Sequence, residues 1–126
     1  MRLWNELSRR ERQIMDVVYT RGEVTVSDVL EGLPDPPSYS AVRAMLGKLE
    51  AKGHLTHDVH GPKYVYRPTL PRAEAQESAL ERVLDTFFEG SPGRAVHAIL
   101  DASAAELTDV ELDELAKLIE RARENR

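Results

Sequence analysis

The sequence predicts a mostly helical α+β fold, a winged helix-turn-helix followed by a helical dimerisation region. Two observations predict this fold. An amphipathic helix over residues 38–52 runs directly into two short strand-like segments, which is the order of a recognition helix and its wing. Past Pro71 the strand pattern stops and three amphipathic helices follow. We therefore divide the chain into a winged-helix domain over 1–71 and a dimerisation region over 72–126.

Composition excludes several classes of protein. With no cysteine among 126 residues, the chain forms no disulfide and has no thiolate chemistry. No apolar run approaches the ~20 residues that span a bilayer, and the first residues lead into no signal-peptide core, so we expect a cytoplasmic protein without membrane contact. The net charge of −5 is unevenly divided. Residues 1–72 hold 11 Lys and Arg against 9 Asp and Glu, whereas residues 73–126 hold 6 against 13, so the first part remains free to meet a polyanion.

A capping box, with Ser8 at the N-cap and Glu11 at N3, predicts a first helix that extends to about Arg21. Its apolar positions recur at helical spacing and form the buried side: Leu7, Ile14, Val17 and Val18. The first turn is basic and contains Arg9, Arg10 and Arg12. Because the helix dipole disfavours cations at this end, either an external anion offsets the cost or the turn is simply solvated.

Glu23 and Val24 predict a short strand that could pair with the later hairpin. Thr25 is the N-cap of a second, short helix to about Leu33. Its apolar positions are Val26, Val29, Leu30 and Leu33. The prolines of residues 34–37 prevent the helix from continuing, so a stiff, extended loop leads to the next helix.

The third helix begins at the N-cap Ser38 and ends at Lys52 and Gly53, a cation and a residue that tolerates positive φ. Its buried stripe consists of Val42, Met45, Leu46 and Leu49. The exposed side, near its start, is small and hydroxylated, with one arginine and no acid: Tyr39, Ser40, Arg43, Ala44 and Gly47. A solvated helix face usually mixes acids with bases, so this composition indicates a surface that meets a large anion.

The strands of the wing contain Leu55, Val59, Tyr64, Val65 and Tyr66, and the turn covers residues 60–63. Pro68 and Pro71 end the hairpin. In this arrangement the helix enters the major groove of a DNA duplex and the basic hairpin tip follows the phosphate backbone. We expect DNA contacts from Arg9, Arg10, Ser38, Tyr39, Ser40, Arg43, Ala44, Gly47, Lys48, Lys63 and Arg67. Within this set Arg43 should read bases and Lys63 should only contact phosphate.

The remaining chain predicts three helices. The first spans about Arg72 to Glu89, the second starts with Ser91 and Pro92, and the third opens with a capping box at Thr108 and frays over residues 121–126. Three such helices cannot bury their apolar side chains alone, so a second copy should cover them, and two-fold symmetry suits a palindromic operator. The expected dimer contacts are Leu80, Val83, Leu84, Phe87, Phe88, Val96, Ile99, Leu100, Leu112, Leu115, Leu118 and Ile119.

Over nearly its whole length the chain resembles the BlaI/MecI penicillinase-repressor family of winged-helix transcriptional regulators. The segments that carry the resemblance, in their order and spacing, are residues 7–11, 17–19, 25–30, 38–43, 46–53, 64–68 and 87–91. The resemblance implies a dimeric repressor whose recognition helix matches residues 38–52 and whose last three helices dimerise.

Two departures from the family concern induction. The members that respond to beta-lactams carry an Asn-Phe bond in the dimerisation region, cut when a membrane sensor-protease is activated, whereas the matching place here is Ala98-Ile99. The related copper-responsive repressors carry a C-terminal cysteine cluster, and this chain has no cysteine. The signal that relieves repression would then be a different cleavage, a small ligand between the helices, or another protein.

Three other functions are alternatives to DNA binding. An enzyme is disfavoured because the sequence has no Ser/His/Asp or Cys/His set and no phosphate-binding glycine loop, and we expect no cofactor. A metal-responsive regulator would use His54, His57 and His60, but this spacing on a strand sends neighbouring side chains to opposite faces. A winged-helix module for protein–protein interaction is the third alternative, and the basic, acid-free side of residues 38–52 argues against it.

Overall fold

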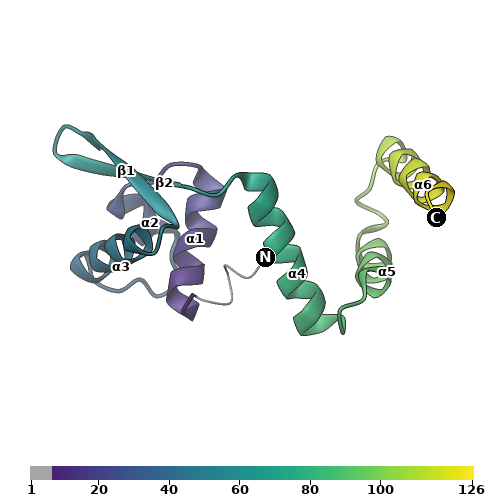
Figure 1. Ribbon diagram of the computed structural model, residues 1–126, viewed down its shortest axis with the longest axis horizontal. Coiled ribbons are helices and arrows are strands. Elements are labelled where there is room, and N and C mark those ends of the chain that lie inside the picture. The colour runs from purple at the N-terminus through teal and green to yellow at the C-terminus, as the bar shows by residue number, and fades with distance from the viewer. Residues whose placement is uncertain (1–6) are drawn as a thin grey trace. The chain divides into compact units, whose positions relative to one another are not determined.

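A computed structural model describes residues 7–126, which form six helices and one β-hairpin (Figure 1). The predicted α+β winged-helix class is confirmed. In chain order the elements are α1 (Arg9–Arg21), α2 (Val26–Gly32), α3 (Tyr39–Ala51), β1 (Leu55–His60), β2 (Lys63–Pro68), α4 (Arg72–Phe87), α5 (Pro92–Ser103) and α6 (Asp109–Glu124). The chain divides into two compact units within α4, between Val83 and Leu84. Across residues 7–126, no helix has the length and apolar character needed to cross a bilayer.

The helix starts lie where the sequence places them. Ser8 and Glu11 form the capping box of α1, with the Glu11 amide donating to Ser8 Oγ at 3.2 Å and the Ser8 amide donating to Glu11 Oε1 at 2.8 Å. The same reciprocal bonds open α2 at Thr25 and α6 at Thr108. Each box satisfies two backbone groups that a helix end otherwise leaves without a partner.

The core of the N-terminal unit is built from the predicted stripes. In this core, side chains of α1, α2 and α3 contact those of β1 and β2. The buried residues of the core include Ile14, Val18, Val29, Val42, Leu46, Leu49 and Leu55. Val24 forms an isolated antiparallel bridge with Tyr66, through backbone bonds of 2.9 and 2.7 Å. The short strand expected at Glu23-Val24 is therefore present as a single bridge, and it anchors the hairpin to the core.

The hairpin is regular. β1 pairs antiparallel with β2, from Leu55 opposite Pro68 to His60 opposite Lys63. Gly61 and Pro62 alone form the turn, and Gly61 has a φ of +62°. A two-residue hairpin turn of the II′ kind requires a positive φ at its first position, which glycine adopts without strain.

The first half of α4 belongs to the N-terminal unit. Ala75 joins the core with 5% exposure, and Ser78 is also buried. Tyr19 Oη donates to the Leu70 carbonyl at 2.9 Å, and Arg72 donates to the Tyr19 carbonyl at 2.5 Å. These contacts hold the start of α4 to the end of α1, although the sequence places the domain division at residue 71.

Two helix ends differ from expectation. The helix expected to reach Glu89 ends at Phe87, because Glu89 and Gly90 both adopt positive φ and turn the chain. The tail expected to fray over residues 121–126 remains helical to Glu124, so that expectation was wrong. Arg121 and Arg123 lie in the last turn of α6, where cations are favourable to the helix dipole.

Candidate nucleic-acid interface

The two sides of α3 differ sharply. Val42, Leu46 and Leu49 are fully buried on one side, and the Ser38 hydroxyl caps the start of the helix by accepting from the Ala41 amide at 3.2 Å. The other side consists of the exposed residues Tyr39, Ser40, Arg43, Ala44, Gly47 and Lys48. A side chain added at Gly47 would meet no atom within 4 Å, so this surface is open. The exposed side of α3 thus contains two cations and no acid.

An ion pair fixes the end of α3 against the start of α1. Lys52 Nζ lies 3.1 and 3.0 Å from the two carboxylate oxygens of Glu11, whose side chain is 6% exposed. The Ser8 backbone bond, together with Lys52, holds the pKa of the Glu11 carboxyl below its ordinary value, although burial acts in the opposite direction. Glu11 therefore caps α1 and positions α3 with one carboxylate.

Arg10 has an intramolecular role that the sequence did not reveal. Its guanidinium donates to the carbonyls of Pro34 and Asp35, at 2.9 and 2.8 Å, and to Gln13 at 3.0 Å. The bonds to Pro34 and Asp35 hold the loop that leads into α3. Neighbouring Arg9 is exposed. A phosphate contact from either arginine remains a prediction.

The wing carries one paired and one unpaired cation. Arg67 on β2 forms an exposed ion pair with Asp58 on β1, and its guanidinium lowers the pKa of the Asp58 carboxyl. Lys63, at the exposed tip of the hairpin, has no hydrogen bond or ion pair with any residue between 7 and 126, although its charge helps to lower the pKa of the Asp28 carboxyl. Lys48 on α3 also has no hydrogen bond or ion pair within these residues. The hairpin tip projects from the N-terminal unit (Figure 1). Lys48 and Lys63 are therefore available to an external anion.

Aromatic side chains join the wing to α3. The His57 and Tyr64 rings stack with centroids 4.3 Å apart and planes inclined by 15°. The carboxylate oxygens of Glu50 lie 2.7 and 2.8 Å from His57 Nδ1, and Arg43 Cζ lies 5.9 Å from the centre of the Tyr64 ring. The sequence alone indicates Tyr64 only as a strand residue. The available signal was its position, because diagonal neighbours on one hairpin face are within reach of aromatic side chains.

The histidines of the wing do not form a metal cluster. His57 is engaged with Glu50 and Tyr64, and His60 is exposed beside the turn. Within residues 7–126, no group of three or more His, Cys, Asp or Glu side chains is arranged to hold a metal ion.

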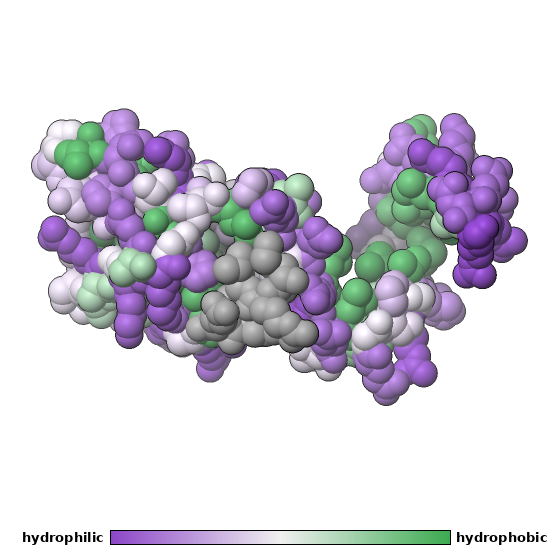
Figure 2. Space-filling model, in the orientation of Figure 1, coloured by the Kyte–Doolittle hydropathy of each residue, from purple (hydrophilic) through white to green (hydrophobic). Residues whose placement is uncertain are grey.

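Apolar side chains are exposed over the C-terminal helices (Figure 2). None of the residues of α5 and α6, all within the described part of the chain, is buried. On α4, Phe87 is 75% exposed and Leu80 is 60% exposed. The structure places all the expected dimer contacts at exposed or half-buried positions: Leu80, Val83, Leu84, Phe87, Phe88, Val96, Ile99, Leu100, Leu112, Leu115, Leu118 and Ile119.

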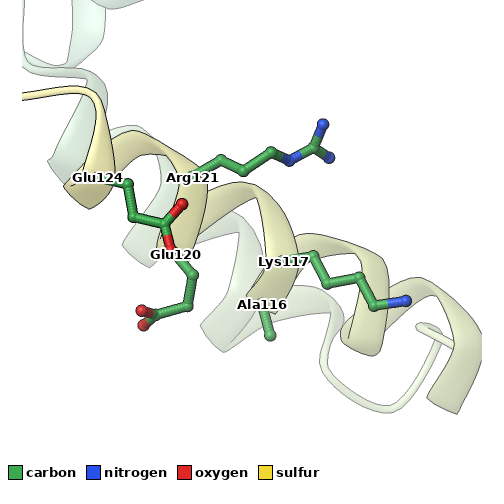
Figure 3. A pocket seen from close by; sticks show the side chains of 5 residues that line it. All are labelled: Ala116, Lys117, Glu120, Arg121 and Glu124. Atoms are coloured by element: carbon green, nitrogen blue, oxygen red, sulfur yellow. The ribbon is translucent and has the colours of Figure 1, made fainter.

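The side of α6 away from these leucines is polar. Ala116, Lys117, Glu120, Arg121 and Glu124 line a shallow surface hollow there (Figure 3). Four of the five side chains are charged and recur at helical spacing. Since α6 has one charged and one apolar side, its apolar side is the one that would pack against another apolar surface.

The chain matches known proteins over most of its length. A family model described as penicillinase repressor matches residues 7–121. The penicillinase repressor of Bacillus licheniformis is 25% identical over 117 residues, which are 91% of this chain and 90% of that repressor. An uncharacterised 16.5 kDa protein of Latilactobacillus sakei is 26% identical over 108 residues, 84% of this chain and 74% of that protein.

Among solved structures, a crystal structure of a MarR mutant from E. coli is similar in fold. Its TM-score is 0.55 at 15% identity, and the similarity covers 96% of this chain and 81% of MarR. At this identity the similarity concerns the fold alone. The family match, which spans the winged-helix unit and nearly all of the C-terminal helices, shows that the chain belongs to the penicillinase repressor family of DNA-binding transcriptional repressors, which are not enzymes.

Proposed function

We propose that this repressor acts as a homodimer and binds a palindromic operator in double-stranded DNA, with one α3 in each of two major grooves. The observation that carries the proposal is the exposed side of α3, which presents Arg43 and Lys48 and no acidic side chain. Glu50, the acid within α3, is half-buried and turned to His57. A helix of this composition next to a hairpin with a lysine at its tip suits a groove lined by phosphates.

The proposal gives the cations different roles. Arg43 bonds base edges, since a guanidinium can reach O6 and N7 of guanine together. Ser38, Tyr39, Ser40, Ala44 and Gly47 line the same surface and allow the close approach of the helix. Phosphates are contacted by Arg9, Arg10, Lys48, Lys63 and Arg67. In this assignment Arg10 and Arg67 contact phosphate while they keep their bonds to Pro34 and Asp58.

Dimerisation uses the apolar sides of α4, α5 and α6, in the region expected from residue 72 onwards. Support comes from the exposure of Phe87, Ile99 and Leu118, which are 75%, 55% and 53% exposed in the isolated chain. Burying apolar side chains of this size contributes about 1.5–3 kcal/mol each, so a second copy with the same surface would be held firmly. Two-fold symmetry then places two α3 helices on one side of the duplex.

The test selects duplexes from a randomised pool with the full chain and measures its mass by sedimentation equilibrium. We expect an inverted repeat and a mass twice that of the 14.2 kDa chain. Affinity for the selected duplex should fall roughly 10³- to 10⁵-fold between 50 and 200 mM salt, the range for six to ten phosphate contacts. A monomer that selects an unrepeated motif, with little dependence on salt, would overturn the proposal.

A further inference from the structure

We propose that Tyr64 is a positioning residue for sequence reading, and that its ring holds the Arg43 guanidinium ready to meet a base. The wing would then determine sequence preference without touching a base itself. The inference rests on the proposed role of Arg43 in base reading and adds to it the group that orients this side chain.

The first support is the geometry of the pair. Arg43 lies on the exposed side of α3 and Tyr64 on β2, yet Cζ of the arginine is 5.9 Å from the ring centre. A guanidinium within about 6 Å of an aromatic face is attracted by the negative charge of that face. Within residues 7–126, no hydrogen bond or ion pair holds Arg43. Its guanidinium lies beside the Tyr64 ring, and its charge also acts on the Tyr66 hydroxyl.

The second support is the way in which the ring itself is held. His57 stacks on Tyr64, and Glu50 lies at hydrogen-bond distance from His57 Nδ1. Glu50 and Arg43 are seven residues apart on α3, two helical turns, and so lie on one side of that helix. A chain of contacts therefore runs from Glu50 on α3 to His57 on β1, then to Tyr64 on β2 and back to Arg43 on α3. Tyr66, which is buried and 6.4 Å from the Tyr64 ring, connects this path to the core.

The consequence concerns the free protein. An unrestrained arginine samples many rotamers, and binding must order it, which weakens the base contact. A side chain that is already held near the ring loses less conformational entropy when it binds a base. Losing an exposed contact of this kind corresponds to about a two- to fivefold loss in affinity. The loss should appear only on a duplex that Arg43 reads, because contacts to phosphate do not depend on this orientation.

The experiment is a double-mutant cycle on sequence preference. Two probes are used, the duplex that the wild-type chain selects from a randomised pool and a shuffled duplex of the same composition. Preference is the ratio of the two affinities, measured for the wild type, Tyr64→Leu, Tyr64→Phe, Arg43→Ala and the double variant Tyr64→Leu/Arg43→Ala. Tyr64 is 41% exposed, so its truncation leaves the core intact. If Tyr64→Leu does not fold, Tyr64→Thr, which retains a strand-forming residue, takes its place.

The inference expects Tyr64→Leu to lower preference about two- to fivefold when Arg43 is present and not at all in the Arg43→Ala background. Tyr64→Phe, which retains the ring, should keep the sequence preference of the wild type. Equal loss on both duplexes would mean that Tyr64 only supports the wing, and would overturn the inference. A loss that persists without Arg43 would also overturn it. Full preference in Arg43→Ala would overturn the proposed base reading, and with it the inference.

A second measurement, made without DNA, distinguishes failure of the positioning role of Tyr64 from failure of base reading by Arg43. The Nε–Hε group of Arg43 gives its own NMR signal in the free full-length chain, and its order parameter reports restraint on the ps–ns timescale. We expect this order parameter to fall in Tyr64→Leu and to be retained in Tyr64→Phe. An unchanged value in Tyr64→Leu would overturn the positioning role while leaving base reading by Arg43 in place.

Discussion

Lys52 at the end of α3 and Glu11 in the first turn of α1 form an ion pair with Nζ and Oε2 3.0 Å apart. The two residues are 41 positions apart in the chain. Glu11 also accepts the Ser8 backbone amide at 2.8 Å, so its carboxylate connects the N-cap of α1 to the end of the recognition helix. One buried carboxylate therefore ties the end of α3 to the N-cap of α1, beside the core packing of Val42, Leu46 and Leu49.

Replacing Glu11 by Gln should destabilise the protein by about 1–2 kcal/mol at neutral pH, measured by urea unfolding. Hydrogen bonds to charged groups contribute about 1.5–3 kcal/mol, and solvent screening at the partly exposed Lys52 reduces that value. Glutamine can still serve at N3 of a capping box, so the cap is largely retained. The matched control is Glu31→Gln, whose side chain is 70% exposed and which should change stability by less than about 0.5 kcal/mol.

The same carboxylate makes stability depend on pH. Because the pKa of Glu11 is lower in the folded chain than in the unfolded chain, the unfolded state binds more protons in the acid range. Its contribution to the free energy of unfolding is complete above the ordinary glutamate pKa and is lost as the pH falls through the folded value. The wild type and Glu11→Gln should therefore converge in stability as the solution is acidified. A difference that stays constant with pH would contradict this assignment.

Replacing Arg43 by Ala should relax sequence preference, whereas replacing Lys63 by Ala should weaken binding to all sequences alike. A guanidinium that bonds a guanine contributes about 1–3 kcal/mol of discrimination, and a lysine at a phosphate contributes none. Affinities of both variants for the selected and the shuffled duplex, measured at one salt concentration, test the difference. The assignment fails if both substitutions reduce the two affinities by the same factor.

A fragment that ends at Val83 should fold, sediment as a monomer and bind the operator more weakly by orders of magnitude. It retains Ala75 and the Tyr19–Leu70 bond, and it loses the tether to a second half-site. A shorter fragment ending at Arg72 omits Ala75 and should unfold at lower urea concentration. Sedimentation and urea unfolding of the two fragments test these expectations, and a dimeric fragment would place the interface in the N-terminal unit.

Exposure of the native cells to a beta-lactam should leave the bond between Ala98 and Ile99 intact. In relatives that the chain resembles, the protease cuts an Asn-Phe bond, and a site that recognises a hydrogen-bonding side chain rejects one without it. Here the bond lies within α5 and presents only alanine and isoleucine. Mass spectrometry of the repressor is the measurement, and fragments that begin at Ile99 would contradict the expectation.

Local signals in the sequence were sufficient for most of the fold. An N-cap acts over three residues and a buried stripe over four, so the starts at Ser8, Thr25, Ser38 and Thr108 and the burial of Leu46 could be predicted from neighbours alone. Family resemblance added the function, because periodicity cannot distinguish a surface for DNA from one for protein.

Contacts between distant residues could not be predicted in this way. The cluster of arginines in the first turn of α1 is compatible with an external anion or with a solvated turn, whereas Arg10 donates to carbonyls 24 and 25 residues away and Arg12 donates to Leu7. Local sequence marks Lys52 only as a cation near a helix end, and Tyr64 only as a strand residue. Each of these roles depends on how α1, α3 and the wing pack together. Such packing between distant segments cannot be predicted from a short stretch of sequence.

Hydroxyl-radical footprinting of the full chain on the duplex that it selects tests the central claim most directly. If a dimer inserts two α3 helices, two protected regions should lie on one face of the duplex, about one helical turn (~34 Å) or a multiple of it apart. Each region should also disappear together with the other as protein is diluted. A single protected region, or two that are occupied independently, would contradict the account.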